Sequence, residues 1–456
     1  MNHFRRKIKS YGFEFNLIWI HLVIGGFIFL LPAFSKLYGI LILVFGAILV
    51  YSKKNRNNEV LMVCGYLVGS DVFLRMTGGV FFYEQTKYAV ILFLLMGIAY
   101  RSSSPKSLVY IFYLLLLVPG IYITTYTLTY DINIRKAIAF NLSGPVCLGI
   151  SAIYCLGRKV SFERLRSIML WILLPILAMT VYLFLYTPSL QDVITGTQSN
   201  FEASGGFGPN QVSTVLGFGM FILITRYFLY SDNLMWKLIN GGLFMLLTYR
   251  ALITFSRGGV FTAILICVVF VLFILYYAKR VTKRRIANTL FILGIVLSLT
   301  WTYSNYVSNG LLEKRYNNQD ALGREKEDLT TGRADLIETE LEAFSRSPFF
   351  GIGVGNNKYY RMQTTGIESA SHNEISRILA EHGAFGIMAL LILLMIPTFR
   401  FMGRHRNIFF MSFFLFWFLT INHSAMRIAA PAFIYGLSLL TITSEKNTLY
   451  RKQISR

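Results

Sequence analysis

Residues 256–280 read SRGGVFTAILICVVFVLFILYYAKR, and this stretch shows what kind of protein the chain is. No charged residue occurs between Val260 and Ala278. An α-helix needs about 20 mostly apolar residues to cross the hydrocarbon core of a bilayer. The stretch therefore predicts a membrane-spanning helix that begins beside Arg257 and ends beside Lys279.

The same pattern recurs along the chain. Apolar stretches of about 17 to 25 residues, which is the length of a spanning helix, give about fourteen candidate spans. Their approximate centres are Ile24, Leu43, Tyr66, Leu94, Leu116, Leu148, Leu174, Gly219, Leu243, Cys267, Val296, Leu391, Leu415 and Leu437. The sequence thus predicts an all-α fold, a polytopic membrane helix bundle with about 12 to 14 transmembrane helices and one large outer-face loop that contains short helices.

Composition and charge agree with a membrane protein. Of the 456 residues, 55% are hydrophobic, 16% aromatic and only 14% charged, whereas a soluble domain carries about a quarter charged residues. A net charge of +22 would favour a nucleic-acid partner in a soluble protein. Here most basic residues fall in alternate connections between the spans. That alternation predicts cytoplasmic N- and C-termini and no nucleic-acid partner.

Two connections are much longer than the others. Residues 187–208 and 307–383 both fall on the predicted outer face, and loops of such length are usually functional or disordered. We expect residues 1–206 to form N-terminal transmembrane helices. Residues 207–397 would form a central domain that includes the periplasmic loop 307–383, and residues 398–456 the C-terminal helices with a basic cytoplasmic tail.

The long outer loop contains a candidate amphipathic helix. Its apolar positions, at helical spacing, are Leu336, Ile337, Leu341 and Phe344. The opposite face carries Asp335, Glu338, Glu342 and Ser345. The pattern predicts a helix that follows Thr330-Thr331-Gly332 and ends at Ser347-Pro348. We interpret Glu338, Glu340 and Glu342 as a solvated face.

A second loop helix is expected from Ser371 to Gly383. Ser371-His372-Asn373-Glu374 has the spacing of a capping box, and Gly383 suits a left-handed position at a helix end. His372 would then lie in the first helical turn, where the helix dipole lowers the pKa of an imidazole. A neutral histidine can take a proton from a hydroxyl group. The alternative interpretation is a solvated histidine beside a cap.

Arginines are the other candidate functional groups. Arg257 begins the quoted span, with Arg250 seven residues earlier, and an arginine at this depth is costly unless it is paired or binds a ligand. Arg333 begins the amphipathic helix, where free N–H groups also favour an anion. Snorkelling of Arg257 and solvation of Arg333 are the structural alternatives.

Other charged residues suggest structure rather than chemistry. Asp71 and Arg75 are spaced i, i+4 and are expected to pair with each other. His382, near the end of the second loop helix, is expected to cap it in its protonated form. The outer loops lack a cluster of metal-ligand type, so we predict chemistry without a metal or another cofactor.

These motifs resemble those of a known family. Ser256-Arg257-Gly258-Gly259, Thr331-Gly332-Arg333, the glycine-rich turn 351–355 and the segment from Ser371 to Gly386 are similar to the O-antigen ligase and polymerase superfamily of bacterial envelope glycosyltransferases. The resemblance covers about residues 207–397. It implies that Arg257, Arg333 and Arg250 bind a pyrophosphate, that His372 is catalytic, and that Asn210, Asn373 and Arg377 position the substrate.

The resemblance also implies a reaction. A glycan carried on undecaprenyl pyrophosphate would move to an acceptor hydroxyl in a metal-independent, inverting transfer, at the periplasmic face of the bacterial inner membrane. The acceptor would be a growing glycan for a polymerase, lipid A core for a ligase, or protein for an oligosaccharyltransferase. Membrane lipids surround such a protein. The alternative from another class is a transporter or flippase of lipid-linked sugars, which would need charged residues along a path through the membrane.

Overall fold

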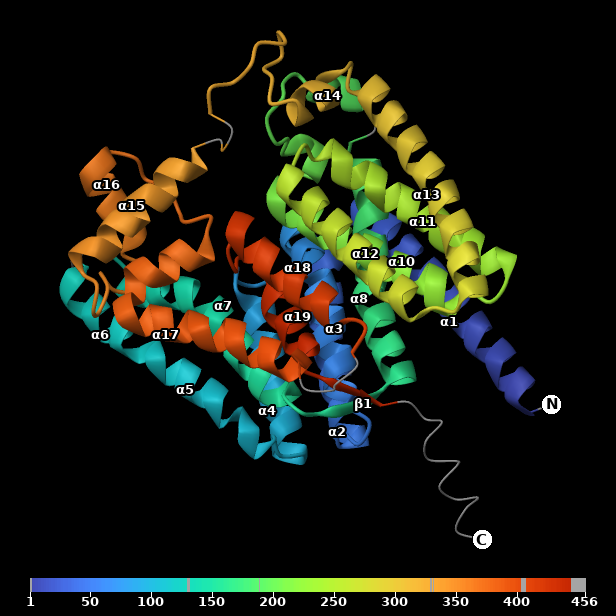
Figure 1. The fold of residues 1–456 in the computed structure, drawn as a ribbon, viewed down its shortest axis with the longest axis horizontal. Helices are drawn as coiled ribbons and strands as arrows, with labels where there is room; N and C mark the ends of the chain where they lie inside the picture. The colour runs from blue at the N-terminus through green and yellow to red at the C-terminus, as the bar shows by residue number, and fades with distance from the viewer. Residues whose placement is uncertain are drawn as a thin grey trace. The chain divides into compact units, whose positions relative to one another are not determined.

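The computed structural model describes residues 2–128, 132–187, 189–328, 330, 332–402 and 407–443, with backbone alone for residues 2–11 and 285. The predictions about Thr331, about part of the basic connection 400–406 and about the basic C-terminal tail concern residues outside this description. The described chain is almost entirely helical (Figure 1). Its strands are the short parallel pair β1 (Lys159–Ser161) and β2 (Thr441–Thr443).

The chain forms two compact units. Unit 1 contains Met1–Leu49, Gly65–Tyr83 and Ser167–Glu325, and unit 2 contains Val50–Cys64, Glu84–Arg166 and Lys326–Arg456. The helices that lie wholly or mostly in unit 1 are α1 (Asn2–Leu30), α2 (Phe34–Lys53), α3 (Glu59–Met76), α8 (Phe162–Tyr186), α9 (Leu190–Val193), η2 (Glu202–Ser204), α10 (Pro209–Tyr230), α11 (Leu234–Ile253), α12 (Arg257–Tyr277), α13 (Arg280–Val307) and α14 (Leu311–Tyr316).

The helices of unit 2 come from both halves of the sequence. They are α4 (Gln85–Tyr100), η1 (Pro105–Ser107), α5 (Leu108–Leu116), α6 (Val118–Thr127), α7 (Ile134–Cys155), α15 (Arg333–Arg346), α16 (Asn357–Thr365), α17 (Glu374–Met402), α18 (Phe410–His423) and α19 (Ala430–Ser438). Within this unit α17 runs beside α5 and α6, and α15 packs across its N-terminal part (Figure 1).

The predicted membrane bundle is confirmed. Each of the fourteen expected span centres lies within a helix. Within the part of the chain that the structure describes, nine helices are long and apolar enough to cross a membrane, and α4 and α18 are shorter apolar helices. With nine residues, α19 is only about 14 Å long, which is less than the hydrocarbon core of a bilayer.

Glycine allows close helix packing in unit 1. A Cβ atom on Gly259 of α12 would overlap the backbone and hydroxyl of Ser213 on α10. The two helices therefore touch at a point that only glycine permits. The expected pair of Asp71 and Arg75 is also present in this unit, with Nε of Arg75 2.8 Å from Oδ1 of Asp71 and both side chains buried.

The first loop helix has the predicted bounds but a different buried face. It runs from Arg333 to Arg346 as α15. Leu341, expected to be buried, is 45% exposed, whereas Glu340 is 1% exposed beside buried Ala343. The interpretation of Glu340 as solvated is wrong, because ion pairing satisfies its charge inside the unit.

The second loop helix starts later than predicted and continues further. It begins at Glu374 as α17, and Gly383 interrupts it with φ 59° and ψ −133° before helix resumes to Met402. This conformation is open to glycine and not to residues with a side chain. Gly383 thus ends the first helical segment as expected, but the chain bends there into an apolar helix.

Candidate active site

A cavity of about 370 Å³ in unit 2 brings together two residues selected from the sequence, Arg333 and His372. We call it the His372 cavity. Its lining residues are Gly332, Arg333, Asp335, Leu336, Thr339, Arg361, Thr365, Ile367, Ser369 and His372. The start of α15, the middle of α16 and the segment before α17 thus form its wall.

His372 has the properties of a neutral proton acceptor. Its Nδ1 atom is buried and has no hydrogen-bond partner among the described residues. Burial, together with nearby positive charge, lowers the pKa of His372 from 6.5 to about 4. The positive charges, in decreasing order of effect, are those of Arg427, Arg333 and Arg361, followed by a smaller effect of His423. At neutral pH the imidazole is therefore uncharged and can accept a proton.

The prediction that His372 lies in the first turn of the helix is wrong. Asn373 is the capping residue, because its Oδ1 accepts hydrogen bonds from the backbone N–H groups of Ile375 and Ser376 at 2.8 and 3.2 Å. His372 therefore precedes the helix. Its lowered pKa comes from burial and arginines, and the helix dipole is not needed to explain it.

Asn373 also joins two helices. Its Nδ2 donates a hydrogen bond of 3.1 Å to Oδ1 of Asn422 on α18. This bond holds the segment that carries His372 against α18, and the role of Asn373 in positioning substrate stays a prediction. No contact with the His372 cavity is made by Asn373 itself within the described structure.

A buried carboxylate holds the cavity wall in place. Glu340 on α15 accepts a hydrogen bond of 2.8 Å from Nη2 of Arg361 on α16. The hydroxyl groups of Ser371 and Ser376 also donate to Glu340. The prediction of a capping box is therefore wrong, because the hydroxyl of Ser371 donates to Glu340 and does not bond to the start of the helix. One carboxylate thus ties α15, α16 and the start of α17 together.

We predict that Glu340→Ala destabilises the folded protein strongly. It would leave Arg361 buried without its carboxylate, and breaking a buried pair in this way costs about 3 to 5 kcal/mol. The matched control on the same helix is Glu342→Ala, which removes an exposed pair with Arg346 worth about 1 kcal/mol or less. Thermal unfolding in detergent should show a clearly lower Tm for Glu340→Ala alone. Equal Tm values for the two variants would contradict the role of Glu340.

Arg377 is a structural link between α17 and α7. Its guanidinium donates to Glu374, to Oε2 of Glu381 at 2.7 Å and to the carbonyl oxygen of Asn141 at 3.1 Å. These acceptors engage the donor groups of the side chain inside the unit. This arrangement fits a role in holding α17 against α7 better than a role in contacting a substrate.

The glycine-rich turn caps the first segment of α17. The N–H groups of Ile352 and Gly353 donate to the carbonyl oxygens of Ala380 and Glu381 at 2.8 and 3.2 Å. These carbonyls are left without helical partners by the break at Gly383. The turn therefore has a structural role.

His382 does not cap the helix as we expected. Its side chain is 1% exposed, and a Cβ atom on Gly120 of α6 would overlap its ring. Its Nδ1 has no hydrogen-bond partner in the described part of the chain. The ring thus fills space between α17 and α6 and lines neither the His372 cavity nor a neighbouring one.

Unit 1 brings together a second group of predicted residues at the turn before α12. Oγ of Ser256 donates to Oδ1 of Asn210 at 2.7 Å, and Arg257 begins the helix directly after it. Phe255 in this turn has a φ of 58°, which is unusual for a bulky residue. Its carbonyl accepts a hydrogen bond of 3.1 Å from Nε of Arg315. Two arginines, Arg257 and Arg315, therefore border the turn.

Arg250 lies deeper in unit 1. Its side chain is fully buried, and Nη2 donates to the carbonyl oxygen of Ala203 at 2.8 Å. Nε and Nη1 have no hydrogen-bond partners among the described residues. Because the group is sealed from solvent, it holds the segment that contains Ala203 rather than presenting an open anion site.

One region of the chain resembles a known protein family. Residues 242–391 match the family described as O-antigen ligase. This part of the chain is similar to O-antigen ligases. A search of curated proteins found no significant match. The apolar helices are those of a multi-pass membrane protein, and the family that residues 242–391 resemble is one of glycosyl-transferring enzymes.

The matched region, residues 242–391, contains most of the residues that the sequence analysis proposed as functional. Arg250, Arg257, Arg333, His372 and Arg377 all lie within residues 242–391, as does Asn373, whereas Asn210 lies before them. The matched region includes parts of both units. Unit 1 therefore carries Asn210, Arg250 and Arg257, and unit 2 carries Arg333 and His372 with their supports.

Four residues near these sites were not selected from the sequence: Glu340, Arg361, Arg315 and Arg427. Arg427 follows α18, and its Nη2 donates to the carbonyl oxygen of Ser371 at 2.9 Å, beside His372. It lies in a connection on the predicted outer side, where the positive-inside pattern expects few basic residues. A basic residue in an outer connection departs from this pattern, and that departure could have marked Arg427 as a candidate functional residue.

Proposed function

We propose that this protein transfers a glycan from undecaprenyl pyrophosphate to an acceptor hydroxyl at the periplasmic face of the bacterial inner membrane. Two findings support the proposal: the similarity of residues 242–391 to O-antigen ligases and the His372 cavity within those residues. The observation that carries it is the pairing in one cavity of a neutral histidine with an unpartnered Nδ1 and of Arg333.

The proposed reaction is a single displacement that inverts the anomeric carbon. The imidazole of His372 takes the proton of the acceptor hydroxyl as the oxygen of that hydroxyl bonds to the anomeric carbon. The bond from that carbon to the pyrophosphate oxygen breaks, and its electron pair leaves with the lipid pyrophosphate. The charge that grows on this leaving group is stabilised by Arg333, which needs no reorganisation because α15 fixes it. The proposal uses no metal ion.

Donor binding and the basicity of His372 are coupled in this mechanism. Burial, together with the nearby arginines, lowers the pKa of His372 to about 4, so without donor the histidine is neutral but a weak base. A pyrophosphate beside the same arginines offsets their charge and raises the pKa of His372 towards its ordinary value. The base thus gains strength when the donor is present.

This coupling predicts a difference between two pH profiles. In kcat/KM for the donor, which reports the free enzyme, the acid limb should lie near pH 4, because His372 is neutral above its pKa of about 4. In kcat, which reports the donor complex, activity should begin to fall at a higher pH. Initial rates of transfer by purified protein between pH 4 and pH 8 provide the measurement. Acid limbs at the same pH in both profiles would contradict the coupling.

Arg257 is proposed as a donor-binding residue on separate grounds. It begins α12 beside Arg315 in unit 1, and the helix start and two guanidinium groups favour an anion. Arg250 and Asn210 are proposed as positioning residues there, since Arg250 holds the segment at Ala203 and Asn210 holds Ser256. In unit 2, Asn373 and Arg377 have the same kind of role.

The proposed topology is tested by labelling. The distribution of basic residues predicts that Asn318 faces the periplasm and that Gln453 faces the cytoplasm. An impermeant maleimide added to whole cells should label Asn318→Cys and leave Gln453→Cys unlabelled until the membrane is opened. The reverse labelling would overturn the topology.

The function itself is tested with purified protein in lipid nanodiscs. The assay supplies an undecaprenyl-pyrophosphate-linked oligosaccharide and, in separate reactions, a glycan, a lipid A core and a protein acceptor, all with EDTA. We expect a glycosylated product from one acceptor and stoichiometric release of undecaprenyl pyrophosphate. Transport of the donor across a vesicle membrane without a new glycosidic bond would instead show a flippase.

A further inference from the structure

Unit 2 contains a second cavity, of about 540 Å³, which the proposed mechanism does not use. We call it the Asn357 cavity. Its volume lies within the range of about 300 to 1,000 Å³ that is usual for small-molecule sites. It is formed by α7, the glycine-rich turn, the start of α16, the segment before α17 and α17 itself. Its lining residues are Asn133, Lys136, Ala137, Phe140, Asn141, Gly355, Asn357, Lys358, Tyr359, Glu368, Ala370, Ser371 and Glu381.

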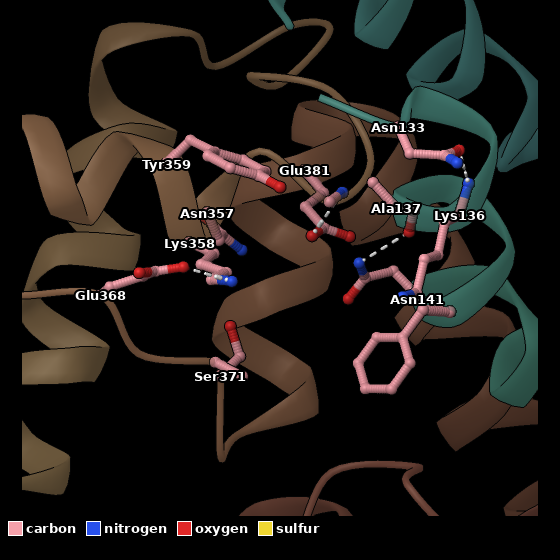
Figure 2. A pocket seen from close by; sticks show the side chains of 13 residues that line it. Asn133, Lys136, Ala137, Asn141, Asn357, Lys358, Tyr359, Glu368, Ser371 and Glu381 are labelled. Carbon is pink, nitrogen blue, oxygen red and sulfur yellow. Dashed lines mark hydrogen bonds and ion pairs between the residues drawn. The ribbon is translucent and has the colours of Figure 1, made fainter. Parts of the chain in front are cut away.

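Asn357 is the residue that marks this cavity as a binding site. Its side chain is only 3% exposed, yet neither Nδ2 nor Oδ1 has a hydrogen-bond partner among the described residues. A buried amide left in this state costs free energy unless a ligand or water bonds to it. Figure 2 shows Asn357, Asn141 and Glu381 around the same space, with the ring of Tyr359 above it.

The lining chemistry favours a ligand rich in hydroxyl groups. Asparagine side chains both donate and accept hydrogen bonds, as sugar hydroxyls do. Two lysines, Lys136 and Lys358, are matched by two carboxylates, Glu368 and Glu381, and Lys358 pairs with Glu368 at 2.5 Å. The balanced charge disfavours a phosphate group.

The Asn357 cavity is a neighbour of the His372 cavity. Glu368, Ala370 and Ser371 line the former, while Ser369 and His372 line the latter. A single short segment, residues 368–372, therefore forms part of both walls. A ligand bound in the Asn357 cavity is therefore held close to His372 on the other side of this segment.

We propose that the Asn357 cavity binds sugar units of the acceptor, which makes the acceptor a glycan rather than a protein. The inference rests on the proposed function. Amide groups of Asn357 would bond to sugar hydroxyls, and the face of Tyr359 would cover the apolar face of a sugar ring. Binding there fixes the acceptor chain so that its terminal hydroxyl reaches His372.

The experiment measures binding without turnover. Full-length protein in nanodiscs is titrated with two lipid-free probes in separate arms, the oligosaccharide repeat released from the lipid-linked donor and the core oligosaccharide released from lipid A. At least one probe should bind wild type. Asn357→Ala and Tyr359→Leu should each weaken that binding about tenfold, since each removes a direct contact. The control is Gln363→Ala, which removes an exposed amide elsewhere on α16 and should not change binding.

The outcomes separate this inference from the proposed function. The His372→Ala protein should bind the probe as wild type does. Loss of transfer in this variant with intact probe binding therefore bears on the catalytic role of His372 and not on the glycan site. Absence of binding by both probes to wild type would overturn the glycan site. Wild-type affinity in Asn357→Ala and Tyr359→Leu proteins would overturn it too. A lowered Tm in Asn357→Ala leaves Tyr359→Leu as the deciding variant, because Tyr359 is only half-buried.

Discussion

Replacing His372 with alanine should lower turnover by about 10² to 10⁴ while the lipid-linked donor still binds, because loss of a general base costs about that factor. The expectation rests on the unpartnered Nδ1 of His372 and on the pKa of about 4 that keeps the ring neutral. Single-turnover transfer and donor binding, each measured with purified protein, give the two quantities separately.

A second histidine provides the control for this prediction. His382 lies on α17, the helix that follows His372, but its ring packs against α6 and lines neither the His372 cavity nor the Asn357 cavity. His382→Gln, chosen because a smaller side chain would leave a void, should keep at least half of the turnover. Similar losses in His372→Ala and His382→Gln, at equal Tm, would remove His372 from the chemistry.

Replacing Arg333 with alanine should lower kcat/KM for the donor by about 10² to 10³, the usual effect of losing one fixed charge-stabilising group. Arg333→Lys should stay strongly impaired, because a point charge does not reproduce the two parallel hydrogen bonds that a guanidinium makes to a phosphate. The matched control is Arg346→Ala at the other end of α15, which removes an exposed arginine paired with Glu342. Near-wild-type rates for Arg333→Ala would show that Arg333 is only solvated.

The same assay tests Arg257 in unit 1. Arg257→Ala should abolish transfer and Arg257→Lys should remain impaired, by the argument given for Arg333. Folding must be intact, since the turn before α12 is also held by Asn210 and Arg315. A well-folded Arg257→Ala protein with normal activity would identify Arg257 as a snorkelling residue.

The membrane fold could be predicted because its signal is local. A run of about 20 apolar residues suffices to predict a span, and each expected centre lies in a helix. The bounds of α15 were predicted for the same reason, since Gly332 and Ser347-Pro348 act on adjacent residues. The length of α19 was not predicted, because hydropathy does not show where an apolar helix stops.

The burial of Glu340 could not be predicted, because it depends on residues far along the chain. Its partners are Arg361, Ser371 and Ser376, and a glutamate on an exposed helix has the same local sequence. A charged side chain is buried at low cost only beside its partner, and the local sequence does not show where that partner lies. The buried face of α15 is turned towards these partners for that reason.

The position of His372 shows how two local signals can compete. The spacing of Ser371 and Glu374 favoured a capping box, but Asn373 caps the helix. Ser371 bonds to Glu340, and Glu374 pairs with Arg377. The tertiary partners of Ser371 and Glu374 therefore decided which residue caps α17 and placed His372 before the helix.

Chemical rescue of His372→Ala tests the central claim most directly. The His372 cavity has a volume of about 370 Å³, so free imidazole can enter it when the ring of His372 is removed. If His372 is the base on the acceptor side, added imidazole should restore part of the lost turnover, and the rescue should rise with the fraction of neutral imidazole as pH increases. A folded, donor-binding His372→Ala protein that imidazole does not rescue at any pH would contradict a proton-accepting role for His372.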